Sequence, residues 1–341
     1  MARTKRVDGF RAPKPTIVDV ARHAGVSAAT VSYVLNGRFS QVSEKTIDKV
    51  RLAVADLGYV KNLTASALSG RRSNLIGVLL PDVLGADSRN EQAELNPFYG
   101  EFIFLLEAEA RARGYALCLY AGRQKDAVEF LLQRHLEAAA LIGFCPPDLQ
   151  MLLDRKGMTL VVYDSFRAHE GVRFVRTDEE RGGALAAEHL LSRGRRKPLF
   201  LGGYMAEFPD HPPAYRFRGA RKVFEQAGLS MEVLEGPTSY SAGFEAAETA
   251  VQLGIDCVVA AADIIAAGLM EGLRQKGRRV PDDVAVTGYD NIPISRHIRP
   301  QLTTVDQRLP EKAAALMASI EEEDAGELVV LEPRLVVRQS S

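Results

Sequence analysis

Residues 16–36 read TIVDVARHAGVSAATVSYVLN, and this stretch predicts two short helices joined by a tight turn. Thr16 has the side chain of a helix N-cap, and apolar residues then recur at the helical period: Ile17, Val20, Ala21 and Ala24. Gly25 suits the turn, because glycine adopts left-handed backbone angles without steric cost. Ser27 caps a second helix, in which we expect three apolar residues to be buried: Val31, Val34 and Leu35.

A third helix is predicted from Ser43 or Glu44 to Leu57, with a stop at Gly58. Three short helices with one shared apolar face make a minimal core. The turn then leaves the second helix free to project its outer face into a DNA major groove. That outer face consists of Ala28, Ala29, Ser32 and Tyr33.

The charge distribution agrees with a nucleic-acid-binding segment at the N-terminus. Residues 1–72 hold 13 Lys and Arg against 5 Asp and Glu, a net charge of +8. The remaining residues hold 30 against 39, which is −9, so the near-zero total conceals an asymmetry. Cationic side chains gain free energy by displacing counterions from phosphates.

The run T-I-x-D-V-A-x-x-A-G-V-S-x-x-T-V-S-x-V-L-N resembles the headpiece of the LacI/GalR (lactose and galactose repressor) family. The resemblance continues through G-Y-V-K-N at 58–62 and L-I-G-V-L-L-P-D at 75–82. It implies a transcriptional regulator whose DNA contacts lie at and around the second helix: Thr16, Ser27, Ala28, Ala29, Thr30, Ser32, Tyr33 and Asn36. Alanine side chains can only contact thymine methyl groups, so base readout depends on Ser27, Tyr33 and DNA shape.

Residues 62–70, NLTASALSG, resemble the hinge helix of that family. A segment this short is not helical by itself in water, so we expect it to become ordered on DNA. The resemblance implies DNA contacts by Asn62, Ala65 and Leu68, with Leu68 opening a base step in the minor groove. The alternative is that Leu68 is an ordinary core residue. Lys61, Ser66 and Tyr33 depart from the family's usual Pro, Arg and Arg.

From residue 74 onward, short apolar segments alternate with amphipathic ones. The predicted strands are Leu75–Leu80, Ala116–Tyr120, Ala139–Phe144, Leu160–Tyr163, Leu199–Gly202, Cys257–Ala261 and Val284–Gly288. The predicted helices include Phe102–Arg113, Ala184–Arg193, Arg218–Ala227 and Ile264–Gln275. This alternation predicts two doubly wound lobes with parallel sheets. The resemblance implies a core similar to a periplasmic sugar-binding protein, with crossings near residues 177–180, 303–306 and 325.

Ligands of open α/β sheets bind beyond the carboxyl ends of the strands. The charged residues predicted there are Asp82, Asp164, Asp263, Asp290 and Arg216. Carboxylates that accept and a guanidinium that donates suit a polyhydroxylated ligand. For Asp82 and Asp263, capping of the next helix or turn is an equally good interpretation.

The resemblance adds effector contacts by matching motifs. N-P-F-Y at 96–99 places Phe98, and with it Asn96, at the cleft. Arg216 in A-Y-R-F-R-G and Asp290 in V-T-G-Y-D-N match residues that grip an effector. Ala262 replaces an amide that the family often uses for a sugar hydroxyl, and Leu84–Leu95 is an insertion. We therefore expect a sugar or sugar derivative that is not an ordinary monosaccharide.

Several classes are disfavoured. No apolar run reaches the roughly 18 residues of a membrane-spanning helix, and the N-terminus lacks a secretory signal. Cys118, Cys145 and Cys257 are far apart in apolar segments, so we expect buried thiols in a cytoplasmic protein. Six scattered His predict no metal site, and nucleotide-binding and nucleophile-elbow motifs are missing. We therefore predict no catalytic residue, no cofactor and no enzyme.

The sequence thus predicts a ligand-responsive, sequence-specific regulator that binds a pseudo-palindromic operator as a homodimer. The expected parts are a headpiece (1–61), a hinge (62–73), an N-terminal lobe (74–178 plus 305–325) and a C-terminal lobe (179–304 plus 326–341). The alternatives are a solute-binding module of a transporter and a hydrolase or isomerase acting on the same ligand. Control by a protein corepressor also remains open.

Overall fold

The computed structural model describes residues 15–35, 37–59, 73–80, 94, 96–122, 124–143, 158–166, 171–322 and 328–341. The chain divides into two units, residues 1–72 and 73–341. Five predicted site residues lie outside the described residues: Asn36, Asn62, Ala65, Leu68 and Asp82. Within the described ranges, no helix has the length and apolarity needed to span a bilayer.

The first unit contains the three predicted helices, α1 (Ile17–Ala24), α2 (Ala28–Leu35) and α3 (Glu44–Leu57), with a short 3-10 turn at Phe39–Gln41. Thr16 and Asp19 form a capping box, because the Thr16 N–H donates to Asp19 Oδ2 (2.9 Å) and the Asp19 N–H donates to Thr16 Oγ1 (3.3 Å). Gly25 ends α1 with a left-handed φ of 67°. The prediction of a helix-turn-helix is confirmed.

The headpiece core is small and is built from one face of each helix. Its buried residues are Val20, Ala21, Val31, Val34, Ile47, Val50 and Ala53. Leu35, expected to be buried, is half-buried at the edge of this cluster.

The second unit contains two sheets of six strands, which confirms the predicted pair of doubly wound lobes. All described strand pairs in these sheets are parallel except β10 and β12, which pair antiparallel. The first has the order β11-β5-β4-β3-β1-β2, and the second has the order β12-β10-β9-β8-β6-β7. The first-lobe strands are β1 (Leu75–Leu80), β2 (Ala116–Ala121), β3 (Ala138–Ile142), β4 (Thr159–Tyr163), β5 (Arg173–Thr177) and β11 (Leu328–Leu331). Those of the second lobe are β6 (Pro198–Leu201), β7 (Glu232–Leu234), β8 (Cys257–Ala260), β9 (Ala285–Asp290), β10 (Thr303–Asp306) and β12 (Arg334–Val336).

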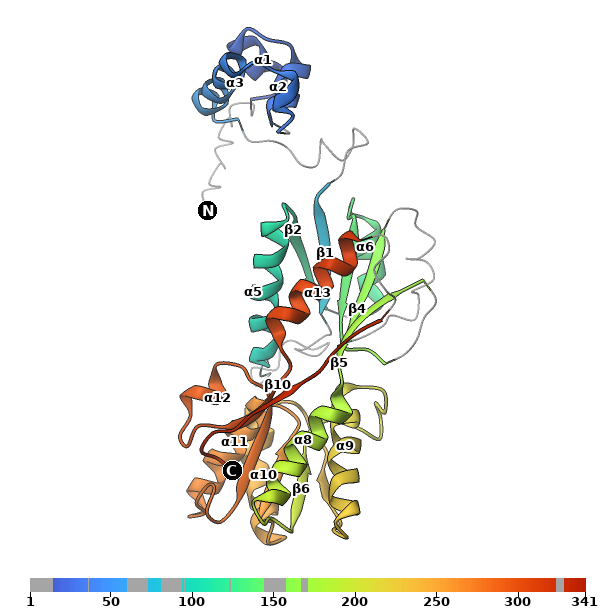
Figure 1. Cartoon of the computed structure of the whole chain (residues 1–341), viewed down its shortest axis with the longest axis vertical. Coiled ribbons are helices and arrows are strands. Elements are labelled where there is room, and N and C mark those ends of the chain that lie inside the picture. Colours follow the sequence, from blue (N-terminus) through green and yellow to red (C-terminus); the bar gives the residue numbers. More distant parts are fainter. Residues whose placement is uncertain are drawn as a thin grey trace, which may run out of the picture. The chain divides into compact units, whose positions relative to one another are not determined.

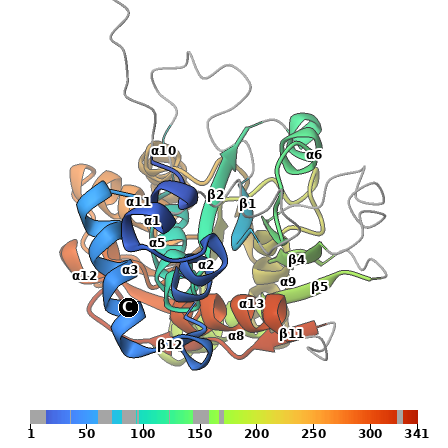
Figure 2. The same ribbon diagram turned by 90° about the horizontal axis from the view of Figure 1, so that it is seen from above.

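Helices cover both faces of the first sheet because its central strands, β1, β3 and β4, are apolar on both sides. Ile76 and Val78 of β1 pack on α5 (Pro97–Ala112) and α13 (Leu309–Glu321), whereas Leu79 packs towards α6 (Gln124–Leu132). Figure 2 shows α5 and α6 on opposite sides of β1 and β2. This is the arrangement that continuous apolar strands of a parallel sheet require.

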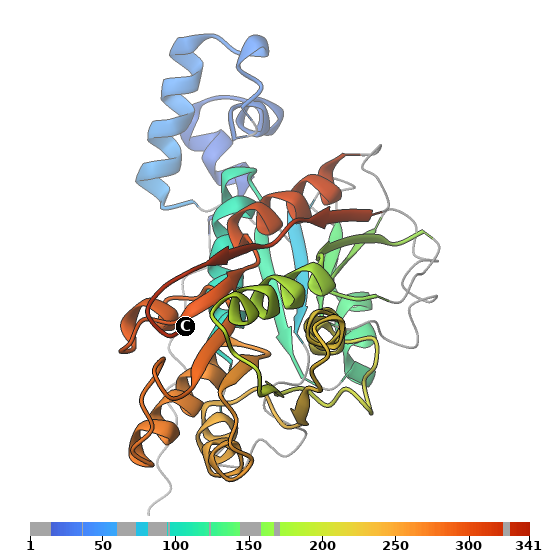
Figure 3. The same cartoon turned by 60° about the horizontal axis from the view of Figure 1, so that its bottom comes forward.

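The second sheet is covered by two pairs of helices. Helix α8 (Glu179–Ser192) packs on α9 (Pro212–Gln226), and α10 (Tyr240–Gln252) packs on α11 (Asp263–Gln275). Figure 3 shows α8 and α9 side by side, and a short helix, α12 (Ile294–His297), follows β9.

The chain crosses between the lobes three times, as Figure 1 shows. It leaves the first lobe after β5, returns between β10 and α13, and crosses finally between β11 and β12. The last crossing lies later than the predicted position near residue 325, because β11 pairs in parallel with β5 of the first sheet. Residues 305 and 306 belong to β10 in the second sheet.

Three helices begin earlier in the chain than predicted. Helix α5 starts at Pro97, α8 at Glu179 and α9 at Pro212. Polar residues and prolines, which are typical of helix N-termini, occupy these first turns. The predicted starts were too late because they were chosen from the apolar periodicity, which begins after the first turn. The difference matters for function, because it places Glu179, Phe98 and Arg216 on helices.

Candidate functional site

A cavity of about 180 Å³ lies between the lobes, at the carboxyl ends of both sheets. We call it the inner cavity. The first lobe contributes Asn96, Phe98, Tyr99, Ile142, Gly143, Tyr163 and Asp164 to its walls. The second lobe contributes His211, Pro212, Pro213, Arg216, Thr238, Ala261, Ala262 and Asp290, and the crossing segment contributes Gln307. The predicted residues Phe98, Asp164, Arg216 and Asp290 therefore meet at one place.

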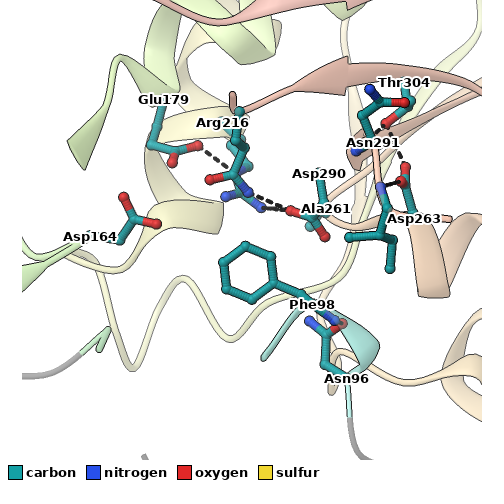
Figure 4. A network of polar contacts seen from close by, with 12 residues as sticks. Asn96, Phe98, Asp164, Glu179, Arg216, Ala261, Asp263, Asp290, Asn291 and Thr304 are labelled. Atoms are coloured by element: carbon teal, nitrogen blue, oxygen red, sulfur yellow. Dashed lines mark hydrogen bonds and ion pairs between the residues drawn. The ribbon is translucent and has the colours of Figure 1, made fainter. Parts of the chain in front are cut away.

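Arg216 is held rigidly on the second-lobe side of this cavity. Its Nε donates to Glu179 Oε2 (2.6 Å), its Nη1 donates to the Ala261 carbonyl (2.6 Å), and its guanidinium lies 3.7 Å from the centre of the Tyr289 ring. Figure 4 shows the hydrogen bonds of Arg216 to Glu179 and Ala261. Burial disfavours the charged form of Arg216, but Glu179, Tyr289 and Asp290 together more than compensate and raise the pKa of the guanidinium. Arg216 is therefore a fixed cation with a defined orientation.

The close approach of α8 and α9 brings Glu179 and Arg216 together. A Cβ atom at Gly183 of α8 would lie 1.9 Å from the carbonyl oxygen of Arg216. Only glycine permits this spacing, so Gly183 acts on the site through the backbone.

Asp290 ends β9 with a φ of 110°, a left-handed value that is strained for a residue with a side chain. Its Oδ1 accepts from the Gln307 side-chain amide and lies 3.9 Å from Arg216 Nη1. Its Oδ2 is buried and has no hydrogen-bond donor among the described residues. Burial raises the pKa of Asp290 to about 7, against the opposing effects of Arg216 and Gln307. A buried acceptor of this kind is suited to a ligand that brings a donor.

Asp164 is not a free acceptor, because Lys312 already binds it. The Lys312 ammonium, fully buried on α13, donates to Asp164 Oδ1 (2.7 Å), Asp164 Oδ2 (2.9 Å) and Gln307 Oε1 (2.9 Å). Burial raises the pKa of Asp164, and Lys312 counteracts part of that effect. Gln307 thus links this first-lobe ion pair to Asp290 of the second lobe.

Asp263 does not line the inner cavity, and its hydrogen bonds favour the alternative interpretation, in which it ties the start of a helix to neighbouring segments. It is fully buried at the start of α11, where Oδ2 accepts from the Ile292 N–H (3.0 Å) and Oδ1 accepts from the Thr304 hydroxyl. Figure 4 shows it turned towards Asn291 and Thr304. Burial, with Asp290 nearby, raises the pKa of Asp263 well above its usual range. The residue ties α11 to the segments after β9 and in β10.

Asn96 and Phe98 form the first-lobe wall opposite Arg216, as Figure 4 shows. Asn96 caps α5, because its Oδ1 accepts from the Phe98 N–H (3.1 Å). Phe98 stacks on Phe102 with ring centroids 6.3 Å apart, which fixes the orientation of the aromatic wall. Next to it, burial and then the charges of Asp290 and Asp164 raise the pKa of Tyr99 to about 12.

In the headpiece, the structure separates the predicted DNA contacts by exposure. Ser27 and Ala29 are exposed, and Ala28, Thr30 and Tyr33 are half-buried. Ser32 is buried, with 7% of its surface exposed, so the prediction that it belongs to the outer face of α2 is wrong. Ser27 Oγ accepts from the Thr30 N–H (3.1 Å), which is the expected cap of the recognition helix.

Three buried polar residues of the site were not predicted: Glu179, Gln307 and Lys312. Each lies in a helix N-terminus or a crossing segment, where charged and amide residues are ordinarily solvated. The motif D-E-E at 178–180 signals only a helix start. In the described part of the chain, no group of three or more His, Cys, Asp and Glu is arranged to hold a metal ion.

Comparison with known families gives two matches. A model described as "Bacterial regulatory proteins, lacI family" matches residues 16–62, and one described as "Periplasmic binding protein-like domain" matches residues 187–341. The chain is 30% identical to the HTH-type transcriptional regulator CelR of Thermobifida fusca, over 97% of this chain and 99% of that protein. It is 33% identical to the ribose operon repressor of Bacillus subtilis, over 89% and 91% of the two chains.

Solved structures agree with these matches. A structure titled as a complex of the transcriptional regulator CelR with cellobiose has a TM-score of 0.67 and 29% identity, covering 96% of this chain and all of the other. The lac repressor dimer bound to operator has a TM-score of 0.79, covering 96% and 99%, and its 23% identity shows the shared fold alone.

Proposed function

This chain belongs to the lacI family of bacterial regulatory proteins, and from that premise we propose that it is a repressor that releases its operator when a saccharide binds in the inner cavity. The family makes it a DNA-binding transcriptional regulator with a ligand-responsive body. We propose further that it acts in the cytoplasm and does not turn its ligand over.

The observation that carries the ligand class is the pairing of Arg216 with Asp290 across the back of the inner cavity. Arg216 presents donors in a fixed orientation, and Asp290 Oδ2 presents an acceptor without a protein donor in the described chain. Each hydroxyl of a sugar both donates and accepts, so a polyhydroxylated ring satisfies both groups. The names of two relatives point to the same class, since one is described with cellobiose and another as a ribose operon repressor.

The headpiece supports operator recognition by α2. Ser27 precedes this helix and is exposed, as is Ala29 in its first turn, and Tyr33 is half-buried. We propose that these three residues enter the major groove while Thr30 approaches the DNA backbone. A two-fold dimer would present two such helices to the half-sites of a pseudo-palindrome. The hinge contacts of Asn62, Ala65 and Leu68 remain part of this proposal.

Coupling between the two functions requires that the saccharide bind one arrangement of the lobes more tightly than the other. Three chain crossings and the hydrogen bonds of Gln307 join the lobes. A ligand that contacts both lobes therefore stabilises one arrangement of the lobes relative to the other. A differential affinity of about 1–3 kcal/mol, typical of allosteric proteins, is enough for a 5- to 150-fold effect on DNA binding.

The test begins with selection of bound sequences from a random double-stranded DNA library by the full chain. We expect a palindromic motif, and we expect glucose, galactose, ribose, lactose or cellobiose to release that DNA in a fluorescence anisotropy assay. Arg216→Lys should retain operator binding and lose the release, whereas Arg221→Lys, on the exposed side of the same helix, should behave as the wild type. Release that is unchanged in Arg216→Lys would overturn the proposed ligand site.

A further inference from the structure

A second cavity, which we call the outer cavity, adjoins the first. It has a volume of about 310 Å³ and shares His211, Pro213 and Thr238 with the inner cavity. Its other walls come from the segment after β6 and from the segment after β7. Because three residues line both cavities, the two cavities are close enough for one ligand of two rings to reach from one to the other.

The chemistry of the two cavities differs. The inner cavity has Arg216, Asp164 and Asp290 in its walls, whereas the described residues that line the outer cavity include no Asp, Glu, Lys or Arg. The outer walls include Tyr204, Met205, Phe208 and prolines. Tyr204 and Phe208 are 47% and 40% exposed, so part of each aromatic side chain is accessible to a ligand.

These aromatic side chains sit on a backbone that its own hydrogen bonds hold in place. Gly203 and Gly236 form a reciprocal pair of backbone hydrogen bonds (2.9 and 3.2 Å), and the Phe208 N–H donates to the Tyr204 carbonyl (2.8 Å). The Phe208 ring stacks on His211 with centroids 4.8 Å apart and an interplanar angle of 17°. The aromatic surface is therefore preorganised, which reduces the entropy lost on binding.

The backbone also keeps the outer cavity open. Gly203 has a φ of 80°, and a Cβ atom there would lie 2.5 Å from Pro213 Cβ. Any larger residue would displace a wall that the two cavities share.

We propose that the two cavities are two subsites for one disaccharide, with its first ring in the inner cavity against Arg216 and Asp290 and its second ring in the outer cavity against Tyr204 and Phe208. A pyranose has polar edges and a face of C–H groups, and aromatic side chains bury such a face favourably. The polar inner cavity suits a ring that is fully hydrogen-bonded, and the uncharged outer cavity suits one bound mainly through its C–H face. This inference rests on the proposed function and adds the length of the ligand to it.

The experiment is isothermal titration calorimetry of the full chain with sugars in matched sets. The sets are glucose with cellobiose and maltose, and galactose with lactose. For at least one set we expect the disaccharide to bind at least tenfold more tightly than its monosaccharide, which corresponds to about 1.4 kcal/mol. Disaccharides that bind no more tightly than the monosaccharides would overturn the inference and leave the proposed function intact. Binding of none of these sugars would overturn the proposed function and the subsite together.

The variants locate the second subsite. Tyr204→Ala and Phe208→Ala should weaken disaccharide binding about tenfold and change monosaccharide binding less than twofold. Tyr204→Phe should retain the affinity because it keeps the ring. Leu253→Ala removes an equally exposed apolar side chain (47%) outside both cavities and should change neither affinity. An equal loss for both sugars in the alanine variants would mean that these residues support the fold rather than a second ring.

Discussion

Replacing Lys312 by Met leaves the carboxylate of Asp164 buried without its counter-charge, and we expect a large loss of stability. Lys312 is fully buried and Asp164 is 5% exposed, so water cannot replace the missing ammonium. Breaking a buried ion pair on one side costs about 3–5 kcal/mol. For a unit of this size the melting temperature should fall by roughly 6–20 °C, at about 2–4 °C per kcal/mol.

Removing both charges should recover most of that loss. Lys312→Met combined with Asp164→Asn leaves no buried charge at the pair, and Asn tolerates the left-handed φ of 53° at position 164. The surface pair of Lys276 and Glu248 is the matched control, since exposed ion pairs contribute about 0–1 kcal/mol and Lys276→Met should be nearly neutral.

The effect should also depend on pH in a defined direction. Burial raises the pKa of Asp164 in the folded protein, and loss of Lys312 removes the main opposing charge. Between the ordinary carboxyl pKa and the raised one, the folded state binds more protons than the unfolded state, so stability falls as pH rises. The Lys312→Met variant should therefore lose less stability at pH 5 than at pH 8.

The assay is urea unfolding of the full chain followed by circular dichroism, since the protein has no Trp for fluorescence. A loss below about 1 kcal/mol for Lys312→Met would refute the reasoning, because that is the value of an exposed pair. A double variant that is as unstable as the sum of its parts would refute it as well, since it would show no coupling.

Asp290→Asn should bind operator normally and lose saccharide-induced release. Because burial raises the pKa of Asp290 to about 7, the saccharide affinity of the wild type should also fall from pH 8 to pH 6. A saccharide affinity that does not change with pH would contradict this role. Gly183→Ala should weaken saccharide binding at least tenfold, because the new Cβ meets the Arg216 backbone. Gly100→Ala is the control, since open space surrounds that position and saccharide binding should not change. Equal saccharide affinities of the two variants in calorimetry would show that the close contact of α8 with α9 does not position Arg216. Leu68→Ala should weaken operator binding far more than nonspecific DNA binding, and equal losses in anisotropy titrations would argue against an ordered hinge helix.

The local parts of the fold were predictable because short-range interactions decide them. Thr16 and Ser27 cap their helices through hydrogen bonds that span three residues, and Gly25 ends α1 through its own backbone angles. The predicted strand Leu75–Leu80 was also correct. A short, continuous apolar run is typical of a strand buried in a parallel sheet, and the run itself marks where that strand begins and ends. Arg216 and Asp290 were found through sequence motifs, and the structure places both at the inner cavity.

The partners of the buried charges could not be predicted. Lys312 and Asp164 are 148 residues apart, and Arg216 and Glu179 are 37 apart, so no local pattern links them. A lysine or glutamate on a helix is solvated in most proteins, and only the packing of α13 and α8 at the inner cavity buries these two. The same reason explains Asp263, whose carboxylate is held by Ile292 and Thr304, and Ser32, which is buried in the headpiece.

The sequence by itself determined the helix-turn-helix, the alternation of strands and helices and the family, because caps, periodicity and motifs are local properties. Tertiary structure alone decided which lobe β11 joins, which carboxylates of the described residues keep an unpaired buried oxygen (Glu179 and Asp290) and where two cavities meet. Those features depend on which distant segments exclude water from one another, and the free energy of a buried charge is set by that exclusion.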